Sequence, residues 1–161
     1  MKPTLALPLL PLLFPLALPL AALPALAQAG PATVVPGAAP LPADDRLYQA
    51  LGGREAIQRF TDDFYDSMLQ DARIARFFDG LNPRYLKRVL ADYFCVVAGG
   101  PCVYDGVGMK DAHAHLGLAK RDFNALVEHL QLAMDRAHVP FSTQNELLAR
   151  LAPAHRDIVT R

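Results

Sequence analysis

The hydrophobic pattern is helical in every regular segment after about residue 45, and it constrains the fold more than any other feature of the chain. Over residues 55–70, for example, Ile57, Phe60 and Phe64 recur at the spacing of one helix face. Similar stripes predict helices at 47–51, 55–70, 83–98, 109–116, 120–137 and 142–160. No segment alternates polar and apolar residues for long enough to predict a strand. The sequence therefore predicts an all-α domain of about five or six helices, several of them too short for a regular four-helix bundle.

The ends of the predicted helices carry local signals. Asp44 or Asp45 is placed to cap the first helix. Pro83 suits the first turn of the helix that it opens. Pro153 predicts a bend in the last helix, because proline cannot donate a backbone hydrogen bond there.

The N-terminal part of the chain differs in composition from the rest. Lys2 is followed by an uncharged, Leu-rich run that ends in Ala25-Leu26-Ala27, a cleavage signal of small residues. This order predicts a secretory signal peptide over residues 1–27. An uncharged linker rich in Pro and Ala then covers 28–43, which leaves 44–161 as one folded domain.

A signal peptide implies export, most simply to a bacterial periplasm, with no stable membrane insertion after cleavage. The alternative is a membrane tether, since the apolar run is long enough to cross a bilayer although prolines interrupt it. Cleavage would leave a net charge of about −1, because Lys2 is the only charged residue that is removed. So small a charge gives no electrostatic case for binding nucleic acid or an anionic membrane.

Two cysteines, Cys95 and Cys102, flank Gly99-Gly-Pro101, which can reverse the chain. Export would expose them to oxidising conditions, so we expect a disulfide, with two free buried thiols as the alternative. Their spacing does not match the Cys-x-x-Cys-His motif of covalent haem attachment.

His113 is the most informative single residue. In a helix over 109–116 it shares one face with Met109, Ala112 and Leu116, whereas His115 points elsewhere. Such an inward imidazole is either a core residue with a hydrogen-bond partner or a ligand, and taken alone it is more often the former.

The surroundings of His113 suit a planar apolar cofactor. Haem needs an axial ligand, an apolar slot and basic or polar groups near its propionates. His113 is a candidate ligand, and Arg84 and Lys87 are candidate propionate contacts. Candidate slot residues are Phe77, Phe78, Phe94 and Met109.

Five short motifs follow one another along the domain. They are Leu47-Tyr-x-x-Leu-Gly-Gly53, Asp63-Phe-Tyr65, Ile74-Ala-Arg-Phe-Phe-Asp-Gly80, Gly99-Gly-Pro101 with Tyr104-Asp-Gly106, and Met109-Lys-Asp-Ala-His113. In this order and spacing they resemble the group I truncated haemoglobins. The resemblance extends over residues 46–161 and rests on the whole set rather than on one motif.

This resemblance implies a two-over-two helical sandwich around haem b. It makes His113 the proximal iron ligand and Tyr65 the distal donor of a hydrogen bond to the bound gas. Phe78 would stack on the porphyrin, and Leu86 and Leu90 would form the distal wall.

The chain also departs from the family pattern on the distal side. Many members place Gln where Leu90 stands, so Tyr65 would be the only strong distal donor here. Some relatives have a second iron-ligating His where Val89 stands, so the iron should be pentacoordinate.

The expected function is reversible binding of oxygen and other diatomic gases at the haem iron. The alternatives are an enzyme of the same fold, either a nitric oxide dioxygenase or a peroxidase, which would need an unidentified electron donor. A haem-free helical interaction module is the least favoured hypothesis, because His113, Tyr65 and Phe78 occur together.

Overall fold

The computed structural model describes residues 44–161, so the predicted signal peptide and linker lie outside the described residues. The described part of the chain contains helices and turns but no strand, which confirms the all-α prediction. Within it, no helix combines the length and the apolar character needed to cross a membrane. The elements are α1 (Arg46–Ala50), α2 (Gly53–Met68), the 3-10 helix η1 (Ala75–Phe78), α3 (Pro83–Val97), α4 (Met109–His113), α5 (Lys120–Arg136), α6 (Phe141–Leu151), the 3-10 helix η2 (Ala152–Ala154) and α7 (His155–Ile158).

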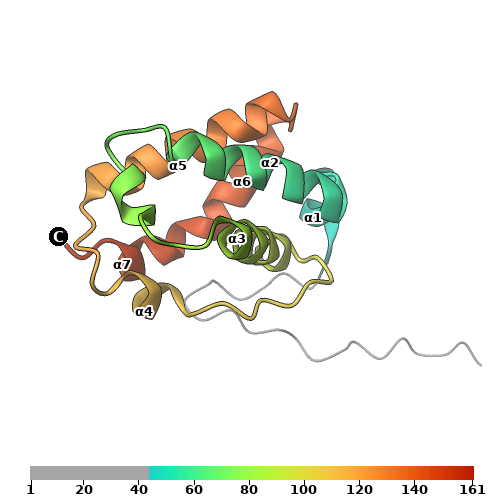
Figure 1. Ribbon diagram of the computed structural model, residues 1–161. Coiled ribbons are helices and arrows are strands. Elements are labelled where there is room, and N and C mark those ends of the chain that lie inside the picture. The colour runs from blue at the N-terminus through green and yellow to red at the C-terminus, as the bar shows by residue number, and fades with distance from the viewer. Residues whose placement is uncertain (1–43) are drawn as a thin grey trace, which may run out of the picture. The chain divides into compact units, whose positions relative to one another are not determined.

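The four longest helices form two stacked pairs. Helix α2 packs against α3 and also against α5, while α6 packs against both α3 and α5 (Figure 1). The pair α2/α3 therefore lies on the pair α5/α6. The short helices α4 and α7 pack against each other, at the end of the molecule where the chain between α2 and α3 also lies (Figure 1).

An aromatic core joins α2 to α3. Phe60 and Phe64 come from the predicted inward stripe of α2 and are each 1% exposed. Both ring centroids lie 6.0 Å from the ring centroid of Phe94 on α3. Burial of each such side chain contributes roughly 1.5–3 kcal/mol, so this cluster holds α2 and α3 together.

The two predicted helix N-termini, of α1 and α3, are capped in different ways. Asp45 occupies the N-cap position of α1, but its side chain makes no capping hydrogen bond. Asp44 instead accepts from the backbone N–H of Arg46 at 3.3 Å, so of the two predicted candidates Asp44 is the one that pairs with a free N–H of the first turn. At α3, Pro83 takes the first helical position as predicted, and the preceding Asn82 side chain accepts from the backbone N–H of Tyr85.

Helix α4 is shorter than predicted, because it ends at His113 rather than near residue 116. The Leu116 N–H donates to the His113 carbonyl at 3.1 Å, a tighter turn than an α-helix allows. Ala112 and Leu116 are therefore exposed, and the predicted inward face retains only Met109 and His113.

The C-terminal helix is broken as Pro153 predicted. Helix α6 ends at Leu151, and η2 turns the chain into the separate helix α7. The preceding helix α5 ends in a Schellman turn, in which Val139 N–H donates to the Met134 carbonyl and His138 N–H to that of Asp135. His138 takes the left-handed position of this turn with φ of 56°, which glycine adopts at lower cost.

Cys95 and Cys102 form a disulfide, with their Cα atoms 6.0 Å apart. The bond ties the last turns of α3 to the loop over residues 99–108 that leads to α4. Gly99 begins this loop at φ of 85°, and a Cβ there would collide with the Asp44 carbonyl oxygen. Both the backbone angle and the contact therefore require glycine.

Candidate functional site

His113 is the last residue of α4 and is half-buried. Its Nδ1 lies 2.7 Å from the carbonyl oxygen of Met109, four residues earlier. Because a carbonyl can only accept, Nδ1 carries the proton, and Nε2 keeps its lone pair. No residue of the described part of the chain makes a hydrogen bond to Nε2. The imidazole is therefore held in the tautomer that a metal ligand requires.

A helix as short as α4 is not stable by itself, so other segments must hold it in place. Its first residue, Met109, is buried in the core. Helix α7 packs against α4. The chain after α7 is also tied down, because the Leu118 carbonyl accepts from the N–H groups of Thr160 and Arg161 at 2.9 and 3.1 Å. The C-terminal segment thereby restrains Leu118, in the chain that follows His113.

Tyr65 lies on α2 with 1% of its side chain exposed, and the Phe78 ring meets it edge-on at 5.8 Å. Burial raises the pKa of the Tyr65 hydroxyl above its ordinary value of 10.0; Lys87 opposes this shift and Asp66 adds to it. The hydroxyl therefore keeps its proton at neutral pH. It has no hydrogen-bond partner among residues 44–161, so it is free to donate to a ligand.

Four further predicted slot residues, which include the Phe78 that contacts Tyr65, lie on α3 and in η1. Leu86 and Leu90, four residues apart on α3, and Phe77 and Phe78, adjacent in η1, are partly buried and pack against the core. None of these four side chains offers a hydrogen-bond donor or acceptor. The structure thus brings together one neutral hydroxyl and apolar side chains.

Phe94 is placed differently from the other slot candidates. Its ring lies deep in the aromatic core against Phe60 and Phe64, with the Tyr93 ring 6.3 Å away. Its contact with a cofactor stays a prediction.

Of the three cations in the first half of α3, Arg84 and Lys87 are the predicted propionate contacts, and Arg88 lies beside them. Lys87 Nζ lies 2.7 Å from an Asp66 carboxylate oxygen. Arg88 bridges Asp92 and Asp105, at 3.1 and 2.9 Å. Arg84 is exposed and makes no ion pair within residues 44–161. A propionate contact by Lys87 would replace or extend its ion pair with Asp66.

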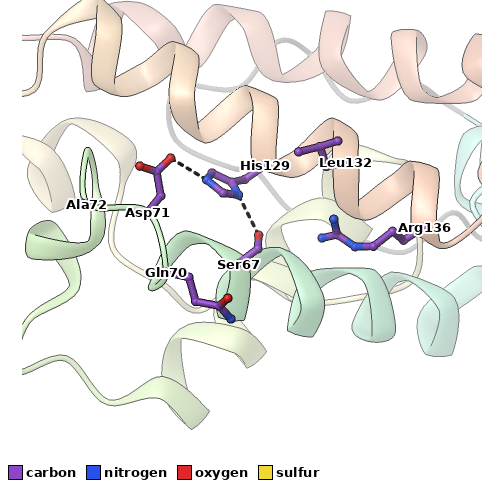
Figure 2. Close-up of a pocket in the computed structure, with 7 residues that line it drawn as sticks. All are labelled: Ser67, Gln70, Asp71, Ala72, His129, Leu132 and Arg136. Carbon is purple, nitrogen blue, oxygen red and sulfur yellow. Dashed lines mark hydrogen bonds and ion pairs between the residues drawn. The ribbon is translucent and has the colours of Figure 1, made fainter.

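A second constellation, which the sequence pattern did not indicate, joins α2 to α5. His129 Nδ1 lies 3.0 Å from Ser67 Oγ, and its Nε2 lies 2.9 Å from an Asp71 carboxylate oxygen (Figure 2). These residues line an open surface pocket of about 370 Å³. The Arg73 guanidinium, and after it His129, hold the pKa of Asp71 well below its usual range.

This Ser-His-Asp group does not have the geometry of a nucleophilic triad. The Ser67 hydroxyl already donates its one proton to the Phe64 carbonyl at 2.8 Å. That proton is therefore not directed at His129, so the imidazole is not placed to activate Ser67 as a base. Ser67 also lies in the last turn of α2, where the helix dipole would destabilise a developing oxyanion. The group fastens α2 and the following loop to α5.

Comparisons with known proteins agree with this architecture. Residues 46–160 match the family model described as Bacterial-like globin. The chain is 34% identical over 114 residues to a group 1 truncated haemoglobin of Mycolicibacterium paratuberculosis, a match that covers 71% of this chain and 84% of that protein.

Solved structures are similar over the same part of the chain. The truncated haemoglobin from Tetrahymena pyriformis in its Fe(III) form is 26% identical, with a TM-score of 0.69 over 71% of this chain and 98% of that one. A 2/2 haemoglobin from Synechococcus, crystallised with covalently attached haem, is 27% identical, with a TM-score of 0.66 over 71% and 98%.

Two stacked helix pairs with a single-turn helix that presents an imidazole define a globin of the shortened, two-over-two kind. The chain belongs to the group 1 truncated haemoglobin family. Haem is therefore its cofactor, and it is a gas-binding globin. The predictions of the family, the fold and the cofactor are confirmed.

Proposed function

We propose that this chain binds oxygen reversibly at a pentacoordinate haem iron, with His113 as the proximal ligand and Tyr65 as the distal donor. When bound, haem iron supplies an axial position at which diatomic gases bind. The single observation that carries the proposal is the 2.7 Å hydrogen bond from His113 Nδ1 to the Met109 carbonyl. A carbonyl partner on the second ring nitrogen is typical of metal-ligating histidines, because it fixes both tautomer and orientation.

The distal residues favour gas binding over turnover. A residue that moves protons during catalysis should have a pKa near the working pH. The pKa of Tyr65 is instead raised from 10.0, and Leu86 and Leu90 cannot carry a proton. A peroxidase function is therefore less well supported than reversible binding.

Nitric oxide oxidation is the remaining enzymatic alternative. It would need an electron donor for turnover, which we have not identified. Mixing the oxygenated protein with nitric oxide tests this alternative. Repeated nitrate formation when a reductant is supplied would favour the enzyme. A single reaction per haem would favour reversible oxygen binding.

The axial-ligand assignment is tested with His113→Ala, using the exposed His115→Ala as the matched control. Loss of haem retention and of the Soret band is expected for His113→Ala, with recovery of the spectrum on adding imidazole. His115→Ala should behave as the unsubstituted protein. A His113→Ala protein with an unchanged spectrum would show that another residue ligates the iron.

We further propose that the protein is exported and cleaved after Ala27. The support is the order of Lys2, the Leu-rich run and Ala25-Leu26-Ala27. A disulfide within the folded part is in keeping with an oxidising compartment. N-terminal sequencing of protein from a periplasmic fraction tests this; an intact N-terminus in the membrane fraction would favour the tether.

A further inference from the structure

Tyr93 has a buried hydroxyl without a partner. The side chain is 5% exposed. Tyr93 Oη is the only side-chain nitrogen or oxygen atom of residues 44–161 that is itself fully buried and lacks a hydrogen bond, whereas the unpaired Tyr65 Oη is not fully buried. Buried polar groups are nearly always satisfied in native proteins, so an unpaired one needs an explanation, such as a ligand or an ordered water.

The position of Tyr93 on α3 places it on the side of the predicted haem slot. It follows Leu86 and Leu90 by seven and three residues, which is the spacing of one helix face. The Tyr104 ring meets the Tyr93 ring edge-on at 5.4 Å, from the loop that leads to α4. The Asp157 carboxylate, on α7, also acts on the Tyr93 hydroxyl. Tyr93 therefore faces the loop over residues 99–108, which leads to the helix that carries His113.

The neighbouring residues do not satisfy this hydroxyl. Tyr104 Oη donates its own proton to the Val107 carbonyl at 2.6 Å. Burial, reinforced by Tyr104 and Asp157, raises the pKa of Tyr93 to about 12. The hydroxyl thus stays protonated at neutral pH and is a donor that lacks an acceptor within the described chain.

We propose that Tyr93 is a haem-binding residue, whose hydroxyl donates to an oxygen acceptor that arrives with the haem. This acceptor is a haem carboxylate or a water molecule held against the haem. The proposal rests on the proposed function, in which His113 of α4 binds the haem iron. A phenylalanine would fill the same space in the core but would leave this acceptor unpaired.

The test compares Tyr93→Phe with the matched control Tyr48→Phe. Tyr48 Oη already has a protein partner, since it accepts from the Arg54 N–H at 3.0 Å. The measurement is the rate of haem transfer from the loaded protein to excess apomyoglobin. Tyr93→Phe should lose haem roughly three- to tenfold faster than the unsubstituted protein, as expected for one hydrogen bond. Tyr48→Phe should lose it at the unsubstituted rate.

Urea unfolding of the haem-free proteins gives a second readout, in which the two substitutions should shift the midpoint in opposite directions. Tyr93→Phe should raise the urea midpoint, because it removes an unsatisfied buried hydroxyl. Tyr48→Phe should lower it, because it removes a satisfied one. A merely structural role for the Tyr93 hydroxyl would lower both haem retention and the haem-free midpoint.

Haem dimethyl ester separates the two acceptors. If the carboxylate is the acceptor, the ratio of the two loss rates should shrink with the ester, because an ester carbonyl is a weaker acceptor than a carboxylate; an unchanged ratio would identify a water. If Tyr93→Phe loses ordinary haem no faster than the unsubstituted protein, the proposal is overturned while the proposed function stands. If the unsubstituted chain takes up no haem, both are overturned.

Discussion

Substitution of Tyr65 by Phe should speed the release of bound oxygen. Under the proposed function Tyr65 donates the distal hydrogen bond, and the apolar side chains of Leu86 and Leu90 offer no substitute. Lys87 is near, with Nζ 5.8 Å from the Tyr65 ring centroid, but it is engaged by Asp66. One hydrogen bond to a polarised ligand in a dry pocket is worth about 1–3 kcal/mol, which corresponds to roughly a 5- to 150-fold change in dissociation rate.

The assay is stopped-flow mixing of the oxygenated, reduced protein with carbon monoxide and an oxygen scavenger. Tyr48→Phe serves as the matched control, because its hydroxyl has a backbone partner on α2. The haem-free stability of Tyr65→Phe should stay close to that of the unsubstituted chain, since Tyr65 Oη has no hydrogen bond within residues 44–161 to lose and, unlike Tyr93 Oη, is not a fully buried unpaired atom. Leu90→Gln should slow release by adding a second donor. An oxygen dissociation rate for Tyr65→Phe within twofold of the unsubstituted value would refute the assignment of Tyr65 as the donor.

Three further predictions concern stability and are checked by urea unfolding. Replacing both Cys95 and Cys102 by Ala should lower the free energy of unfolding by about 2–3 kcal/mol, and reduced unsubstituted protein should match the variant; equal stability of the oxidised protein would show that the bond contributes nothing. His138→Gly should raise the free energy of unfolding by roughly 0.5–1 kcal/mol, because glycine relieves the positive φ. If the free energy does not rise, His138 makes a compensating contact. Asp71, whose pKa is lowered mainly by Arg73, contributes stability that is present above its usual value of 3.8 and is lost as pH falls through the lower native value. Asp71→Asn should therefore flatten the loss of stability below about pH 4, and an unchanged acid profile would contradict this linkage.

The helices and their inward faces follow from the sequence because apolar spacing is a local property. Ile57, Phe60 and Phe64 are buried as their periodicity predicts. The order and spacing of the motifs also identified the family and, through it, the haem cofactor. Boundaries were less certain: α4 stops at His113 because a single turn is held by its neighbours rather than by its own pattern.

Hydrogen-bond partners depend on the tertiary structure. Ser67 and His129 are 62 residues apart, and no local pattern indicates that they meet. The ion pair between Lys87 and Asp66 likewise joins two helices, and no local pattern indicates it.

The sequence by itself determined the helical fold class, the family and the identity of His113 and Tyr65 as candidate site residues. Only the tertiary structure decided that His113 Nδ1 donates to Met109, which leaves Nε2 available, and that Tyr93 Oη has no acceptor within the described residues. The physical reason is that periodicity sets the direction of a side chain, whereas the pairing of a polar atom depends on which distant segments pack around it.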